Sequence, residues 1–173
     1  MTAGHRYFFI LTTAVFLVPQ LVLHSVPEHQ METVVAYDGV KLSGRLKTDR
    51  RFELFIENVP TNSVLATSAN PKTRNLGFHE DPSAVNIIIK DIILVIDGKN
   101  IEIPKNTYED LWNVILPRGV YLMESGPHAL IYLEGGDGES SYTARLIIEG
   151  DRVLRRETIG GGTSWNNAET IKF

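Results

Sequence analysis

The chain has 173 residues, of which 43% are hydrophobic and 22% charged, and its formal net charge is −4 at pH 7. This length and composition suit one folded domain with a real core and exclude a chain that is disordered throughout. The acidic balance gives no overall attraction to nucleic acid. Because cysteine is absent, disulfides, thiolate metal sites and a cysteine nucleophile are excluded.

An apolar run near the N-terminus predicts export. Residues 7–18 are apolar except for two threonines, and they follow Arg6, the only firmly charged residue before Glu28. A short positive segment followed by an apolar run is typical of a secretory signal peptide. We therefore expect residues 1–25 to be a signal peptide or membrane anchor, 26–32 a linker and 33–173 one β-rich domain. Only residues 7–23 would then contact a membrane, if uncleaved, and the domain would be periplasmic or extracellular.

The first predicted hairpin joins residues 33–37 to residues 40–47 across Asp38-Gly39. Apolar and polar residues alternate in the second of these segments, which predicts a sheet with one face in water. Phe52, Leu54 and Ile56 continue this pattern, and we expect Pro60 to end the strand.

Residues 61–83 are rich in Asn, Ser, Thr and Pro and have no sustained periodicity. Such a long loop in a compact domain is commonly functional or mobile. His79, Glu80 and Asp81 are therefore the candidate site residues in this segment.

Residues 85–104 contain the densest run of β-branched residues and an Asp97-Gly98 turn signal. A two-residue turn there places Leu94 opposite Ile101 and Ile92 opposite Ile103, on one buried face. Residues before Lys90 have the opposite alternation, which predicts a bulge at Lys90-Asp91.

Residues 104–113 predict one short helix, with Asn106 as the N-cap and Glu109 as its capping-box partner. Tyr108, Leu111 and Trp112 would face the sheet. Strands are expected at residues 119–124, 128–134, 141–149, 152–159 and 168–173. Short strands with frequent turns predict an all-β fold, either an antiparallel sandwich or a partly open barrel, preceded by the N-terminal signal or anchor helix.

The C-terminal half also carries a resemblance. The sequence EGGDGESSYTARLIIEGDRVLRRETI, with IDGKNIEIPKNTYEDL upstream, resembles an uncharacterised set of small, exported, β-rich bacterial proteins. The resemblance implies a shared fold and an exported location, and it implies no activity.

The segment 134–141 gathers three carboxylates and three glycines. Calcium binds loops of this kind, but the spacing differs from that of an EF-hand, so we favour a glycine-rich turn whose acids, Asp137 included, face water. His79, Glu80 and Asp81 with His128 would need to meet in space to hold zinc, and they lack the spacing of known motifs. We therefore expect no metal and no cofactor.

Four arginines lie on the last two long predicted strands, namely Arg145, Arg152, Arg155 and Arg156. With Gly150-Asp151 as a two-residue turn, Arg145 would lie opposite Arg156, an arrangement that calls for an anion or a nearby acid. Glu149 and Glu157 are acids that would make a salt-bridged solvent face. The functional alternative is a site at Arg145, Arg155 and Arg156 for an anionic partner, an envelope polymer or an acidic protein.

The sequence contains no Gly-x-Ser-x-Gly motif, phosphate-binding loop or dinucleotide fingerprint. We therefore favour an exported, non-catalytic β-domain that binds a macromolecular or cell-envelope partner, rather than nucleic acid. The alternative is a small envelope hydrolase with its site between residues 61–83 and the glycine-rich turn at 134–141. A ligand-holding barrel would instead need a sizeable apolar cavity.

Overall fold

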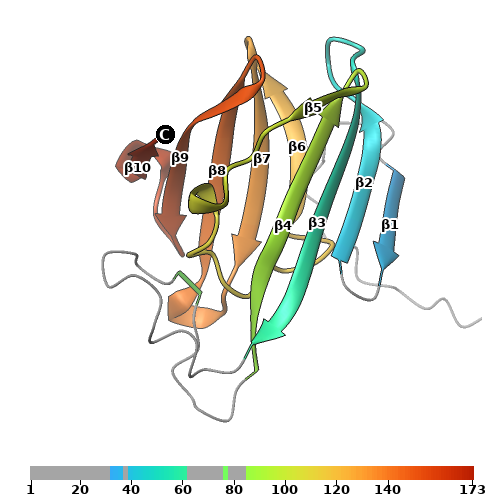
Figure 1. The fold of residues 1–173 in the computed structure, drawn as a ribbon. Coiled ribbons are helices and arrows are strands. Elements are labelled where there is room, and N and C mark those ends of the chain that lie inside the picture. The colour runs from blue at the N-terminus through green and yellow to red at the C-terminus, as the bar shows by residue number, and fades with distance from the viewer. Residues whose placement is uncertain (1–31, 37–38, 62–75, 78–84) are drawn as a thin grey trace, which may run out of the picture.

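The computed structural model describes residues 32–36, 39–61, 76–77 and 85–173. Within these ranges, ten strands form two antiparallel sheets of five strands each (Figure 1). The sheets lie face to face, which confirms the all-β prediction in its sandwich form. The predicted N-terminal helix and linker lie outside the described residues.

Each sheet contains strands in their order along the chain. The first sheet consists of β1 (Glu32–Ala36), β2 (Gly39–Arg45), β3 (Arg51–Thr61), β4 (Asn86–Ile96) and β5 (Lys99–Ile101). The second consists of β6 (Val120–Ser125), β7 (His128–Gly135), β8 (Tyr142–Glu149), β9 (Arg152–Gly160) and β10 (Glu169–Lys172). Three short 3-10 helices complete the described structure, namely η1 (Lys105–Thr107), η2 (Gly138–Ser140) and η3 (Trp165–Asn167).

The β4–β5 hairpin has the predicted register, with Leu94 opposite Ile101. Asp97 and Gly98 form the turn with φ angles of 50° and 77°, the left-handed backbone that a two-residue hairpin turn of this type requires. The predicted bulge is also present, because Glu57 of β3 faces Asp91 whereas its neighbour Asn58 faces Ile89, leaving Lys90 unmatched.

The predicted turn at Asp38-Gly39 is wrong by one residue, because Gly39 belongs to β2 and pairs with Ala36. Residues 37–38 lie outside the described residues. The prediction that Pro60 ends β3 is wrong by one residue. Because β2 pairs with β3 only from Arg51 to Glu57, Pro60 lies on a stretch where β3 has β4 as its one described neighbour. A proline without an N–H is tolerated at such an edge.

The predicted helix at residues 104–113 is wrong in kind, because only the single 3-10 turn of η1 forms. Its N-cap position is Pro104 rather than Asn106, and no side chain caps it. The backbone that follows bonds to Leu76 and to β4 instead. Trp112 N–H donates to the Leu76 carbonyl at 2.9 Å, and Asn113 N–H donates to the Ile87 carbonyl at 2.7 Å. These long-range bonds use backbone N–H groups that a continuing helix would need for its own hydrogen bonds.

The interior lies between the sheets and is formed by alternate residues of both. Its most deeply buried members include Leu54 and Leu94 of the first sheet and Ile131 and Leu146 of the second. The predicted stripe of Tyr108, Leu111 and Trp112 is buried, as expected.

Glu124 joins the two sheets at the end where β2 turns into β3. Its carboxylate, whose side chain is only 3% exposed, pairs with Arg50 and accepts hydrogen bonds from the Thr48 N–H and hydroxyl, both at 2.7 Å. Burial opposes ionisation of Glu124, but the bonds from Arg50 and Thr48 outweigh it and lower the pKa of this carboxyl.

No helix among the described residues is long and apolar enough to cross a membrane. Residues 7–23, the predicted anchor, lie outside those residues, so the export prediction stays a prediction.

Candidate functional site

A row of side chains crosses the outer face of the second sheet. Successive strands place its members directly opposite one another, and directly opposed residues point to the same side of a sheet. The row consists of Tyr121 of β6, Tyr132 of β7, Arg145 of β8, Glu157 of β9 and Thr170 of β10. It therefore presents aromatic rings at one end and charged and polar groups at the other.

The aromatic end of the row is closely packed. The Tyr121 and Tyr132 rings stack with centroids 4.5 Å apart, and Trp165 contacts Tyr132 edge-on at 6.0 Å. Leu130, Ile147 and Met123 pack with these rings. We call Tyr121, Met123, Leu130, Tyr132, Ile147 and Trp165 the outer-face cluster. Leu130, Tyr132 and Ile147 are buried and the other three are partly exposed, so this sheet has a second, smaller hydrophobic cluster besides the core.

Trp165 belongs to η3, in the connection between β9 and β10, and it covers both Tyr132 and Arg145. The Arg145 guanidinium carbon lies 4.0 Å from the centroid of the Trp165 ring, a cation–π contact. Backbone bonds from Thr163 N–H to the Gly160 carbonyl and from Asn167 N–H to the Ser164 carbonyl fold this connection. The indole is thereby held over the face while remaining partly exposed.

The predicted pairing of Arg145 with Arg156 is wrong. Arg145 lies opposite Glu157, because β9 contains a bulge: Ile147 faces Arg155 whereas Ile148 faces Val153. The unmatched Leu154 moves every later residue of β9 by one position, which exchanges the faces. Arg156 consequently points into the interior.

Arg145 and Arg155 share Glu157. Arg145 Nε donates to Glu157 Oε2 at 2.7 Å, and Arg155 Nε donates to Oε1 at 2.8 Å. Burial opposes ionisation of Glu157, but the hydrogen bonds from the two guanidiniums outweigh it and lower the pKa of this carboxyl. One acid thus compensates one of two positive charges, and the Arg155 side chain remains 37% exposed.

Arg156 is 2% exposed and is held by η1 and the residues after it. Its guanidinium donates to the Thr107 carbonyl at 3.0 Å and to Asp110 Oδ2 at 2.7 Å, with a second bond to Asp110 Oδ1. The three arginines of the predicted anion site are therefore divided between the outer face and the core.

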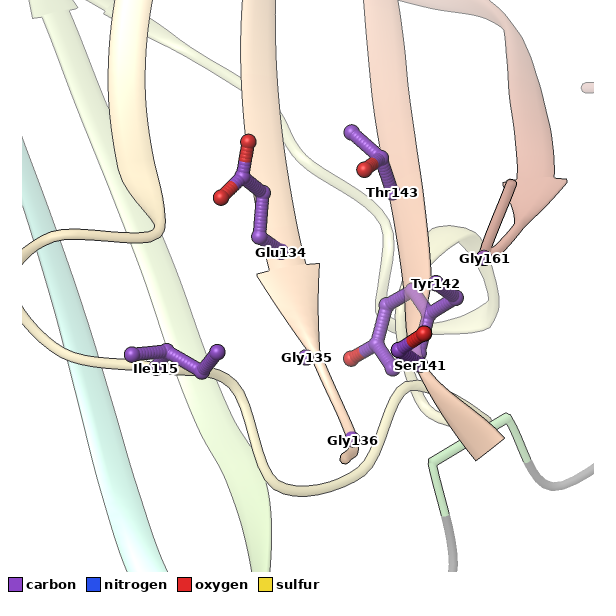
Figure 2. A pocket seen from close by; sticks show the side chains of 8 residues that line it. All are labelled: Ile115, Glu134, Gly135, Gly136, Ser141, Tyr142, Thr143 and Gly161. Atoms are coloured by element: carbon purple, nitrogen blue, oxygen red, sulfur yellow. The ribbon is translucent and has the colours of Figure 1, made fainter. Parts of the chain in front are cut away.

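A pocket of about 230 Å³ opens beside this row, toward the end of the sheet at Gly135 (Figure 2). Glu134 of β7 and Thr143 of β8 lie directly opposite each other, and Figure 2 shows their side chains on the same side of the sheet. The pocket is lined by Ile115, Glu134, Gly135, Gly136, Ser141, Tyr142, Thr143 and Gly161.

Glu134 is partly buried, and no described side chain donates to or pairs with its carboxylate. The negative charge of Glu134 acts on Tyr121, which lies diagonally across the β6–β7 strand pair. Burial, then the Glu134 charge, then Tyr132 raise the pKa of Tyr121 to about 12. Glu134 therefore places a negative charge at the pocket end of the face.

Close backbone packing forms the base of the pocket. A Cβ on Gly135 would lie 2.4 Å from the Tyr142 hydroxyl oxygen, and a Cβ on Gly77 would lie 2.6 Å from the Trp112 carbonyl oxygen. The Tyr142 hydroxyl donates to that same carbonyl at 3.0 Å, and burial raises the pKa of Tyr142. Gly77 also lies against Gly136, so the chain at residues 76–77 reaches the glycine-rich turn.

The predicted loop site is described only in part. Asp137 is exposed and caps η2, where its carbonyl accepts a bond from the Ser140 hydroxyl at 2.8 Å. His128 begins β7, and at ~3.3 Å per residue it lies roughly 23 Å from the other end of that strand, where Asp137 follows. His79, Glu80 and Asp81 lie outside the described residues. Within the described ranges, no group of three or more His, Cys, Asp or Glu could hold a metal ion.

Sequence reasoning missed the aromatic residues of the face. Tyr121 and Tyr132 each alternate with apolar core residues along their strands. This alternation is a signal that both tyrosines lie on the outer face. Trp165 is an aromatic residue in a segment otherwise rich in Gly, Ser, Thr and Asn, which is a signal for a surface contact.

No protein-family model, curated protein or solved structure matches this chain.

Proposed function

We propose that this protein is an exported, non-catalytic binding domain that holds a cell-envelope macromolecule on the outer face of its second sheet. The observation that carries the proposal is the row from Tyr121 to Thr170, with Trp165 held over it and the Glu134 pocket beside it. Trp, Tyr and Arg are the residue types most often responsible for binding energy at protein interfaces. Tyr121, Arg145 and Trp165 are partly exposed on one sheet face, with Tyr132 buried among them, and this arrangement favours a binding role.

The size of the pocket supports a large partner. Pockets that enclose a whole small molecule commonly measure roughly 300–1,000 Å³. At about 230 Å³, this one suits a single group that projects from a larger partner lying along the face.

Two charged residues of the face, Arg155 and Glu134, bear on the charge of that partner. The partly exposed Arg155 favours the anionic partner expected from the sequence, an envelope polymer or an acidic protein. The Glu134 end of the same face favours a positive group. A partner with both kinds of charge would match the row along its length.

The test is binding of the purified domain to a sedimented envelope fraction, comparing the wild type with Trp165→Ala. We expect the variant to lose most of the bound protein, because truncation of a central aromatic commonly costs more than about 1 kcal/mol of binding energy. Phe55→Ala is the matched control. Phe55 is a partly exposed aromatic on the outer face of the first sheet, where it lies opposite Ile93 and Lys41.

Equal binding by the wild type and Trp165→Ala would contradict the proposed face, and no binding by either would contradict the proposed function. Weaker binding at high salt would favour charged contacts, which are screened within about 10 Å at 0.1 M salt.

The exported location has its own test. A reporter that is active only outside the cytoplasm, fused after residue 32, should become active, because residues 1–25 have the pattern of a signal peptide or anchor. A silent reporter at normal expression would contradict export.

One observation favours the second candidate, an envelope hydrolase. Gly77 lies against Gly136, so part of the long segment 61–83 does meet the glycine-rich turn. Hydrolysis of a chromogenic ester or labelled peptide by the wild type, abolished in both His79→Ala and Asp137→Ala, would support this alternative. Absence of turnover with these substrates would favour the binding domain.

A further inference from the structure

Glu134 differs from the other partly or fully buried carboxylates of the described chain. Four of those acids pair with a cation: Glu57 with Lys90, Asp110 with Arg156, Glu124 with Arg50, and Glu157 with two arginines. Asp91 accepts a bond from the Ile92 N–H at 2.9 Å. Glu134 alone among them has neither a cation nor a hydrogen-bond donor. A partly desolvated charge without compensation is unfavourable, so this position calls for a positive group from outside.

The surroundings of Glu134 restrict the kind of positive group. Thr143 lies directly opposite, which places its hydroxyl oxygen within reach of a group bound to the carboxylate. Ile115, 47% exposed, forms an apolar wall of the same pocket. The raised pKa of Tyr121 is consistent with negative potential here.

We propose that the Glu134 pocket binds the primary ammonium of a lysine side chain presented by a protein or peptide partner. This inference rests on the proposed binding function and names the group recognised at one end of the face. The ammonium is a compact charge with three donors, which suits one carboxylate and one hydroxyl on facing strands. The apolar stem of the lysine lies along Ile115, as such stems do on apolar surface.

The available space agrees with this occupant. At roughly 30 Å³ per water-sized group, a pocket of about 230 Å³ holds seven or eight such groups. A lysine stem with its ammonium, four carbons and one nitrogen, fits within that space. An amino sugar would leave Ile115 without an apolar stem to cover it.

The experiment titrates the intact chain with Nα-acetyl-lysine methylamide and follows the backbone amide signals of Gly135 and Thr143 by NMR. We expect saturable shifts in the wild type and affinity weaker by about tenfold or more in Glu134→Gln, because a charge-assisted hydrogen bond is lost. Glu149→Gln is the matched control. It removes the same charge from an exposed position on β8 of the same sheet and should leave the affinity unchanged.

Two further probes test the chemistry. The norleucine analogue keeps the stem without the charge, and glucosamine carries an amine without the stem, so both should bind much more weakly. Thr143→Val, which keeps a β-branched side chain in the strand, should also weaken binding and serves if Glu134→Gln alters the fold. Equal affinity in Glu134→Gln and the wild type would overturn the site, and tight binding of glucosamine would assign it to an amino sugar instead.

These results separate the two proposals. Envelope binding that depends on Trp165 while the lysine probe fails to bind would reject the lysine site and leave the binding function standing. Lysine-probe binding that depends on Glu134, without any envelope binding, would reject the proposed function and leave the pocket chemistry standing.

Discussion

Arg156 and Asp110 form a buried ion pair that joins β9 to the segment after η1. The guanidinium contacts both carboxylate oxygens, and the two side chains are 2% and 6% exposed. Together with the bond from Arg156 to the Thr107 carbonyl, this contact holds η1 and the residues after it against β9.

Asp110→Ala should destabilise the fold by about 3–5 kcal/mol, because it leaves a buried arginine without its counter-charge. The free energy of unfolding from urea titration measures this loss. Glu109→Ala changes the exposed neighbouring acid and should stay within about 0.5 kcal/mol of the wild type. Replacing both partners, as in Asp110→Leu with Arg156→Met, should restore much of the stability; a double variant as unstable as Asp110→Ala would contradict the assignment of the loss to the unpaired charge.

Leu94→Ala should cost about 2–5 kcal/mol, because it creates a cavity beneath a fully buried position opposite Ile101. Glu102, just after β5, is exposed, and Glu102→Ala should change stability by less than about 0.5 kcal/mol. Chemical denaturation of both variants makes the comparison. Similar losses in the two would mean that the faces of this hairpin are exchanged.

Glu124 should contribute a pH-dependent part of the stability. Its pKa is lower in the folded state than its ordinary value of 4.5, so the unfolded chain binds the proton more readily. The stabilisation is therefore present above the unfolded pKa and is lost as the pH falls through the folded pKa. Urea titrations between pH 7 and pH 3 should show the difference between wild type and Glu124→Gln shrinking below about pH 4.5. A difference that stays constant over this range would mean that Glu124 acts without its charge.

Gly135→Ala should destabilise by about 1–3 kcal/mol through overpacking, because the new Cβ would meet the Tyr142 ring and hydroxyl at 2.4–2.6 Å. Gly160, at the end of β9, has no atom within 4 Å of an added Cβ. Gly160→Ala is therefore the matched control and should be nearly neutral. Thermal unfolding of the two variants separates a steric effect from a general loss of glycine flexibility.

Local signals in the sequence predicted much of the fold. The Asp97-Gly98 turn determined the β4–β5 register because a two-residue hairpin leaves one pairing, and the change of alternation at Lys90 revealed its bulge. The bulge at Leu154 was not predicted, because apolar and polar residues alternate poorly over residues 152–159. No apolar pattern therefore indicated the change of register. Arg156 was placed on the surface for that reason.

The helix prediction failed because capping signals are local, whereas the competing contacts are not. Residues 110–113 form backbone hydrogen bonds with Leu76 and Ile87. No sequence signal near Asn106 indicates these distant partners. The outer face could not be predicted either, because it depends on the register of five strands and on the position of η3. Each strand alone shows a single outward residue of the row, for example Tyr132 between the core residues Ile131 and Leu133.

The strand order has a consequence for how the chain folds. Every ladder within the two sheets joins strands that follow one another in sequence, and residues 102–119 connect the sheets. Folding rates fall as contacts become more distant along the chain. We therefore expect each sheet to assemble from neighbouring strands, and the docking of one meander on the other to be the slower event.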